Sequence, residues 1–129
     1  MNLPEEYYSW LETIDTDSEY RYRNIIINFY SKSDLQNKNK LSSEFFNKNI
    51  FINNIIELKA EELESNNTYT FTEERADKCI TIGESNRNHI FVDPNENFSI
   101  WVLILSNKCV FKESGNIHDI IKFTQSYDA

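Results

Sequence analysis

Two histidines and two cysteines are the residues of this sequence that could supply a nucleophile and its general base. His89 precedes Asp93 by four positions in a predicted strand, so both side chains would share one face of a sheet. Cys79 or Cys109 could supply a thiol, and His118 a second imidazole on a predicted helix. The G-x-S-x-G, H-E-x-x-H and C-x-x-C signatures are absent, and both cysteines stand in apolar segments that favour buried, inert thiols. We therefore predict no catalytic residue, and a small enzyme using His89 with Cys79 or Asp93 is the least favoured reading.

Residues 93–99 open like the D-x-N-x-N pattern of a calcium-binding loop. The sixth position is Phe98, where the sharp turn needs Gly, and the twelfth is Ile104, where a bidentate Glu is needed, so the pattern predicts a hairpin turn. Two cysteines thirty residues apart and two histidines fit neither a disulfide framework nor a structural zinc site. The chain has two glycines, Gly83 and Gly115, which excludes glycine-rich phosphate loops. The sequence predicts no metal and no cofactor.

Acidic residues are concentrated in two stretches of the 129-residue chain, which carries 13 Lys and Arg against 21 Asp and Glu, a formal charge of −8. Residues 1–20 hold six acids and no base, and residues 57–77 hold seven acids against Lys59 and Arg75. We interpret both stretches as acidic surfaces that steer a basic partner, although solvated helix faces are a common alternative explanation. A nucleic-acid partner is not expected, because binding phosphate requires a basic surface.

The N-terminal half is expected to contain one amphipathic helix and several shorter elements. Residues 3–14 have a proline near the start, acids in the first turn and apolar residues at helical spacing, which predicts a helix. Residues 20–30 alternate in polarity and predict one strand with a buried centre. Residues 31–43 predict either a loop with a short helix or a mobile segment. Residues 49–58 predict a strand or two strand pieces, and residues 59–65 predict a short helix.

The C-terminal half is expected to form a meander of antiparallel hairpins followed by a helix. Four strands are predicted, at residues 79–82, 89–92, 100–105 and 109–112. Residues 100–105 are apolar at every position, so this strand is expected at the centre of the sheet with both faces covered. Asn116 is the predicted N-cap of the closing helix, with Asp119 in its first turn. The order of elements predicts one α+β domain over residues 1–129.

No segment of the sequence is long enough to cross a membrane as a helix. The longest apolar run has six residues, against the roughly 20 that a spanning helix needs. The N-terminal residues are acidic where a secretory signal would be basic. We therefore expect a cytoplasmic protein without a membrane partner.

Four stretches resemble the SUKH superfamily, the Smi/Knr-like proteins. Residues 3–11, Leu-Pro-Glu-Glu-Tyr-Tyr-Ser-Trp-Leu, resemble that family's Leu-Pro-x-x-Tyr-x-x-Phe-Leu opening helix. Residues 55–63 resemble its strand and short Glu-Glu-Leu helix, residues 80–93 its hairpin ending in Asp, and residues 116–123 its closing helix. The resemblance implies a single SUKH-like α+β domain over residues 1–129. Its twisted, mostly antiparallel sheet would be flanked by an N-terminal and a C-terminal helix.

Bacterial members of the SUKH superfamily are mostly cytosolic immunity proteins that bind and neutralise polymorphic toxins, and they transfer no catalytic residues. The resemblance therefore implies an immunity protein whose partner is a cognate toxin. The acidic charge of the chain predicts that this toxin is basic, and a nuclease is one class of toxin that fits. An intracellular regulatory scaffold or adaptor domain is the alternative, and the oligomeric state is left open. The expected contact residues are acids of the two stretches and two tyrosines: Glu5, Glu6, Tyr7, Glu12, Asp15, Asp17, Tyr20, Glu61, Glu62 and Glu64.

Overall fold

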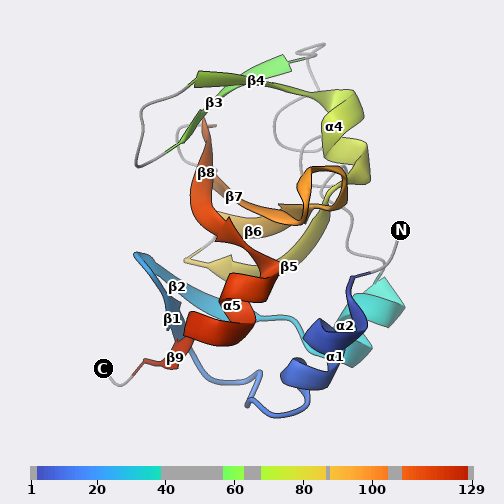
Figure 1. Ribbon diagram of the computed structural model, residues 1–129, viewed down its shortest axis with the longest axis vertical. Coiled ribbons are helices and arrows are strands. Elements are labelled where there is room, and N and C mark those ends of the chain that lie inside the picture. The colour runs from blue at the N-terminus through green and yellow to red at the C-terminus, as the bar shows by residue number, and fades with distance from the viewer. Residues whose placement is uncertain (1–2, 39–56, 63–67, 87, 105–108, 128–129) are drawn as a thin grey trace.

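The chain folds as one curled, mostly antiparallel sheet with helices packed against it, an α+β arrangement (Figure 1). A computed structural model describes residues 3–38, 57–62, 68–86, 88–104 and 109–127. Within these ranges nine strands follow the order β4-β3-β8-β7-β6-β5-β2-β1-β9. The strands are β1 (Tyr20–Tyr22), β2 (Ile25–Phe29), β3 (Glu57–Glu62), β4 (Thr68–Thr72), β5 (Ile80–Ser85), β6 (Asn88–Asp93), β7 (Ser99–Ile104), β8 (Cys109–Asn116) and β9 (Gln125–Ser126). The helices are α1 (Glu5–Leu11), α2 (Lys32–Lys38), α4 (Glu73–Lys78), the 3-10 turn η2 (Pro94–Glu96) and α5 (Ile117–Phe123).

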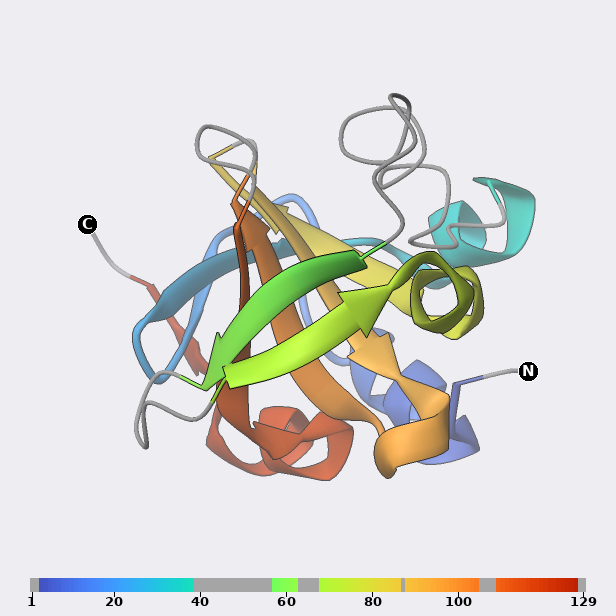
Figure 2. The same ribbon diagram turned by 90° about the horizontal axis from the view of Figure 1, so that it is seen from above.

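The predicted meander forms the centre of the sheet, as β5, β6, β7 and β8 pair antiparallel in sequence order. Side chains alternate between its two faces. Ile90 and Ile100 join the core that includes α1 and α5, whereas Phe91 and Trp101 face the opposite side, and all four are 0–1% exposed. Figure 1 shows β3, β4 and α4 beyond that opposite side, and Figure 2 shows β3 and β4 lying over the central strands when the molecule is seen from above. The prediction that β7 lies centrally with both faces covered is confirmed.

The prediction of one strand over residues 20–30 is wrong, because the chain reverses within it. β1 and β2 form a hairpin in which Tyr22 pairs with Ile25, and Arg23 in the turn has a φ of 52°. Directly paired residues of an antiparallel hairpin point to the same face. Tyr22 and Ile27 are therefore both buried in one core, although their positions in the sequence suggest opposite faces.

The short helix predicted at residues 59–65 is also wrong over its described part, residues 59–62, which belong to β3. This strand pairs antiparallel with β4 and parallel with β8, and ladder pairing on both sides overrides a helix propensity of tenths of a kcal/mol per residue. β4, α4 and β9 were not predicted. Residues 49–56 and 63–65 lie outside the described residues, while the described part of residues 31–43 contains the helix α2. Its first turn is capped by Ser31, whose hydroxyl accepts the Asp34 amide at 3.1 Å.

The closing helix α5 begins as predicted. The Asn116 side chain accepts the His118 amide, and the Asp119 carboxylate accepts the Asn116 amide, each at 2.9 Å, which completes a capping box. Gly115, with a φ of +87°, precedes this cap, and an added Cβ there would lie 2.4 Å from the Tyr22 hydroxyl. Leu3, Tyr7 and Leu11 of the N-terminal segment are buried in the same core as Ile117 and Ile120 of α5. The two terminal helices thus cover one face of the sheet together.

Candidate functional site

The acids of the first stretch are all exposed, on α1 and on the turn that follows it. We call this region the acidic surface; its six exposed members are Glu5, Glu6, Glu12, Asp15, Asp17 and Glu19. The turn is held by Asp15, whose carboxylate accepts the Asp17 amide at 3.0 Å and the Ser18 hydroxyl at 2.9 Å. These hydrogen bonds lower the pKa of Asp15 below its ordinary value, since they favour the ionised carboxylate. Asp15 therefore fixes the conformation of this turn and stays ionised at neutral pH.

Two members of the acidic surface are tied to neighbouring elements. The Glu6 carboxylate contacts the His118 ring of α5, and Glu12 lies 3.5 Å from the Lys32 ammonium of α2. Both contacts are largely exposed, so each adds at most a small amount to stability. The buried side chains of Tyr7 and Leu11 position α1, and its carboxylates stay accessible.

The prediction of Tyr7 as a contact residue is wrong. Tyr7 is fully buried, and burial raises the pKa of its hydroxyl far above the ordinary value. Its ring packs 5.7 Å from the Trp10 ring, between centroids, so it anchors α1 in the core. Tyr20 does adjoin the acidic surface, because its hydroxyl accepts the Asp15 amide at 2.8 Å.

The two acidic stretches do not form one surface. Glu61 and Glu62 lie on β3, where their backbones pair with Phe111 and Lys112 of β8. Figure 1 places β3 at the opposite end of the molecule from α1. Glu64 lies outside the described residues. A partner that covers the acidic surface would therefore not reach β3 without wrapping around the domain.

Among the described side chains, the residues considered for nucleophilic chemistry are not brought into one site, and the Cys109 side chain lies outside the described part. The Cys79 thiol is buried and lies 3.3 Å from the Arg75 carbonyl, and burial, with the nearby Asp93 carboxylate, raises its pKa far above the ordinary value. Asp93 accepts a 2.8 Å hydrogen bond from Arg75. His89 lies four residues along β6 from Asp93, about 13 Å at strand spacing. His89 is therefore outside hydrogen-bond reach of Asp93.

Four charged residues form a polar cluster around Trp101: Arg75, Asp93, Glu96 and Lys112. The Arg75 guanidinium lies 4.5 Å from the Trp101 ring centroid and bonds Asp93 and Glu96, and Lys112 bonds Glu96 at 2.7 Å. Burial opposes ionisation of Glu96, but the Lys112 hydrogen bond and the Arg75 charge lower its pKa overall. Cation–π and ion-pair contacts of this kind hold α4 and the η2 turn against the sheet.

Residues 93–99, which begin like a calcium-binding loop, form a turn. Asp93 caps η2 by accepting the Asn95 amide at 2.9 Å, and both Asn97 and Phe98 have φ near +50°. No group of three or more potential metal ligands occurs in the described part of the chain. The expected hairpin turn is confirmed.

A second exposed region lies where β1, β9 and the end of α5 meet, and the sequence did not indicate it. We call it the arginine–aromatic surface; its members are Arg21, Arg23, Phe123, Gln125 and Tyr127. Phe123 is 56% exposed and Tyr127 37% exposed, and the Arg21 guanidinium lies 5.6 Å from the Tyr127 ring centroid. A hollow of about 370 Å³ separates the arginines from Phe123. One feature of the sequence indicates that Phe123 is exposed: it does not share the helix face on which α5 buries its isoleucines.

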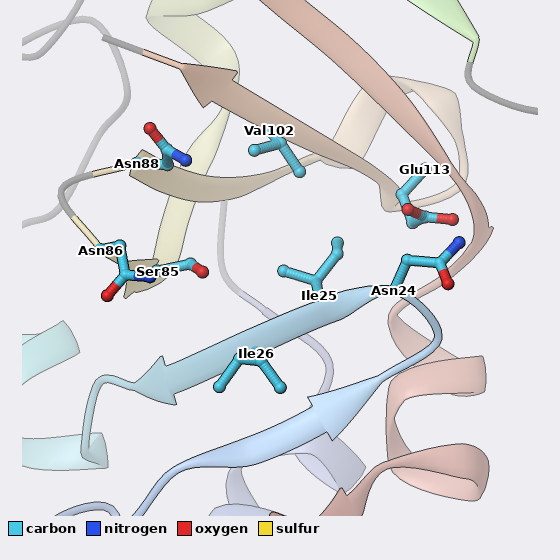
Figure 3. Close-up of a pocket in the computed structure, with 8 residues that line it drawn as sticks. All are labelled: Asn24, Ile25, Ile26, Ser85, Asn86, Asn88, Val102 and Glu113. Carbon is cyan, nitrogen blue, oxygen red and sulfur yellow. The ribbon is translucent and has the colours of Figure 1, made fainter. Parts of the chain in front are cut away.

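A pocket of about 310 Å³ lies between β2 and the β5–β6 turn (Figure 3). Its polar lining residues come from the turns at Asn24 and Asn86 and from β5, β6 and β8, and its apolar ones from β2 and β7. The lining comprises Asn24, Ile25, Ile26, Ser85, Asn86, Asn88, Val102 and Glu113. No sequence pattern indicates this pocket, because its lining residues are spread over five strands and two turns.

No protein-family model, curated protein or solved structure matches this chain. Among the described residues, no helix is long and apolar enough to span a membrane. The surfaces and the pocket described above are therefore the features that bear on function.

Proposed function

We propose that this protein is a SUKH-like, cytoplasmic immunity protein that binds a basic toxin domain through its acidic surface. The observation that carries the proposal is the gathering of six exposed carboxylates on α1 and the following turn, with no basic residue in the first twenty positions. Such a concentration of one sign of charge accelerates encounter with an oppositely charged protein and disfavours like-charged competitors.

The arrangement of α1 supports binding as well as steering. Glu5, Tyr8 and Glu12 follow one another at helical spacings of three and four residues, so they share one face of the helix. Tyr8 is half-buried, with its ring 5.8 Å from the Lys32 ammonium. A partly exposed tyrosine between two carboxylates combines an aromatic contact with the charges that a basic surface requires.

Inhibition follows from competition for a cationic surface. A nuclease must hold phosphate groups with basic side chains, and an array of carboxylates can occupy the same side chains. The inhibitor then needs no chemistry of its own, because covering the substrate groove is sufficient. We therefore propose a nuclease as the toxin class.

Co-expression with the toxin encoded by the neighbouring gene tests the proposal. The wild-type chain should relieve toxicity and elute with the toxin in size-exclusion chromatography. The triple variant Glu12→Lys/Asp17→Lys/Glu19→Lys should do neither, whereas Asp77→Lys, an exposed reversal on α4, should behave as wild type. Unrelieved toxicity together with the absence of a complex for the wild-type chain would exclude the immunity function.

A second candidate is a regulatory adaptor domain, which the arginine–aromatic surface favours. Arginine and aromatic side chains are enriched among residues that dominate binding energy at protein interfaces. Phe123 is also more exposed than most large apolar side chains in a folded domain. Capture of an intracellular partner that is lost on Phe123→Ser, but kept in the acidic triple variant, would select this function.

A further inference from the structure

The solvent face of the β1–β9 ladder carries charges of both signs. Arg21 pairs with Gln125 in this antiparallel ladder. The hydrogen bond from the Tyr127 amide to the Glu19 carbonyl continues the ladder, so these two residues also lie opposite one another. Directly paired residues point to the same face, and so do residues two positions apart in one strand. The four side chains therefore share one face, and all four residues are exposed.

The charges of Arg21 and Glu19 are both open to a partner. The Arg21 guanidinium lies 5.6 Å from the Tyr127 ring centroid, a diagonal contact across the two strands. Among the residues that the structure describes, no carboxylate lies within ion-pair distance of this guanidinium, although Glu19 is only two positions away. The face thus presents a base and an acid side by side.

The hollow beside Arg21 suits the side chain of a glutamate. Its volume is about 370 Å³, and it is lined by Arg21, Arg23, Phe123 and Gln125. Phe123, which is 56% exposed, gives the hollow an apolar wall opposite the arginines. A glutamate has two methylenes that can pack on this ring and a carboxylate that can accept two hydrogen bonds from a guanidinium. A glutamate side chain therefore matches both walls.

A second copy of this chain supplies such a glutamate. In a contact with two-fold symmetry each copy presents the same patch, so the patch must be complementary to itself. Glu19 and the cationic hollow lie side by side on one face, and a two-fold rotation between them exchanges their positions. We propose that two copies associate through this face about a two-fold axis, with Glu19 of the partner subunit in the hollow beside Arg21 and Phe123.

The net charge of −8 on each copy opposes this association only at long range. The Debye length is about 8 Å at an ionic strength of about 0.15 M, so repulsion between distant carboxylates is largely screened. The two ion pairs at the contact are screened less, because exposed aromatic rings of both copies cover them. A contact built on so few side chains belongs with weak, transient interfaces, and we expect a dissociation constant of about 10 to 100 µM.

This dimer goes beyond the immunity function and does not rest on it. The argument for it uses the β1–β9 face, and its test contains no toxin. One consequence connects the two proposals: Glu19 belongs to the acidic surface, so a basic toxin and a second copy of the chain would compete for it.

Sedimentation velocity of the protein alone, from about 5 to about 500 µM, tests the proposal. The wild type should change from monomer to dimer over this range. Glu19→Arg and Arg21→Glu should each stay monomeric, because each brings like charges together at both symmetry-related contacts. Asp77→Arg makes the same charge change as Glu19→Arg at an exposed position on α4, which Figure 1 places far from β1 and β9, and should dimerise as wild type.

Exchanging the two charges separates this pairing from a general effect of charge. An equimolar mixture of Glu19→Arg and Arg21→Glu should form heterodimers, because an acid again faces a base at both contacts. The double variant Glu19→Arg/Arg21→Glu keeps the net charge of −8 and should dimerise again. Phe123→Ser keeps both charges, should weaken dimerisation at least about tenfold, and serves if a charge variant does not fold.

A wild type that is monomeric at about 500 µM would leave this face to a different protein and overturn the proposal. Dimers in both single variants, or a mixture of the two that stays monomeric, would overturn it as well. Oligomers that keep growing with concentration would indicate a head-to-tail contact and overturn the two-fold arrangement.

Discussion

The acidic surface and the arginine–aromatic surface adjoin one another and present opposite chemistry. They meet at the start of β1, where the Tyr127 amide donates to the Glu19 carbonyl at 3.2 Å. The first presents carboxylates and keeps its anchor Tyr7 buried, whereas the second exposes Phe123 and Tyr127 beside two arginines. Charges attract a partner over distances near a Debye length and mainly set the association rate. Exposed aromatic side chains act only once the partner is in contact, and they mainly set the dissociation rate. The two surfaces therefore suit different kinds of partner.

The largest contrast between the surfaces is expected in stability. Tyr7→Ala should lower the free energy of unfolding by about 3–5 kcal/mol, because it removes a fully buried aromatic side chain beneath the acidic surface. Phe123→Ala should change it by less than about 0.5 kcal/mol, since Phe123 is 56% exposed. Urea unfolding monitored by circular dichroism measures both.

Tyr7→Phe is the control for this comparison. The Tyr7 hydroxyl has no hydrogen-bond partner among the described residues, so its removal should change stability by no more than about 1 kcal/mol in either direction. Equal losses for Tyr7→Ala and Phe123→Ala would contradict the assignment of one aromatic to the core and the other to the surface.

The next largest effect is expected in association with the toxin. Glu12→Lys/Asp17→Lys/Glu19→Lys should slow association about 10- to 100-fold at low salt, and the difference should shrink as salt rises. Glu12→Lys loses the exposed contact with Lys32, which adds little to stability, and places a cation at the C-terminal end of α1, where cations are favourable. Stopped-flow association at two ionic strengths gives the rates, and equal rates for the variant and the wild type would remove the acidic surface from the interface.

A smaller effect of opposite sign is expected from the neighbouring surface. Arg21→Gln/Arg23→Gln removes two positive charges beside the acidic surface and should accelerate association with a basic toxin about two- to fivefold at low salt. The dissociation rate should stay unchanged. A faster dissociation, in this variant or in Phe123→Ser, would show that the arginine–aromatic surface is the contact and would reverse the comparison.

Local chemistry determined which parts of the fold could be predicted from the sequence. The strands β5 to β8 are short apolar runs separated by polar connections, and the cap at Asn116 depends on residues within one turn, so both were predicted correctly. The reversal at Arg23 was not, because an arginine with positive φ carries no turn signature and the alternation continues through it. β3 was missed because its pairing with β8 joins residues about fifty positions apart.

The same distinction applies to the candidate sites. The exposed carboxylates of α1 could be predicted, because acids at a helix start are solvated. The burial of Tyr7 was available in the spacing of Leu3, Tyr7 and Leu11, which places all three on one helix face. The pocket between β2 and the β5–β6 turn could not be predicted, since its lining residues come from strands that only long-range pairing brings together.

The smallest expected effect concerns the pH dependence of the acidic turn. The pKa of Asp15 is lowered in the folded protein, so its ionised carboxylate contributes stability above the unfolded-state value near 4, and this contribution is lost as pH falls through the folded-state pKa. Asp15→Asn keeps a carboxamide oxygen for the Asp17 amide but cannot titrate. The wild type should therefore be slightly more stable at pH 6, and the difference should disappear on acidification to about pH 2.5.

Asp17→Asn removes an equal charge from the same turn and separates this effect from net charge. Urea midpoints of the three proteins across this range measure the effect, and a stability difference between wild type and Asp15→Asn that grows on acidification would contradict it.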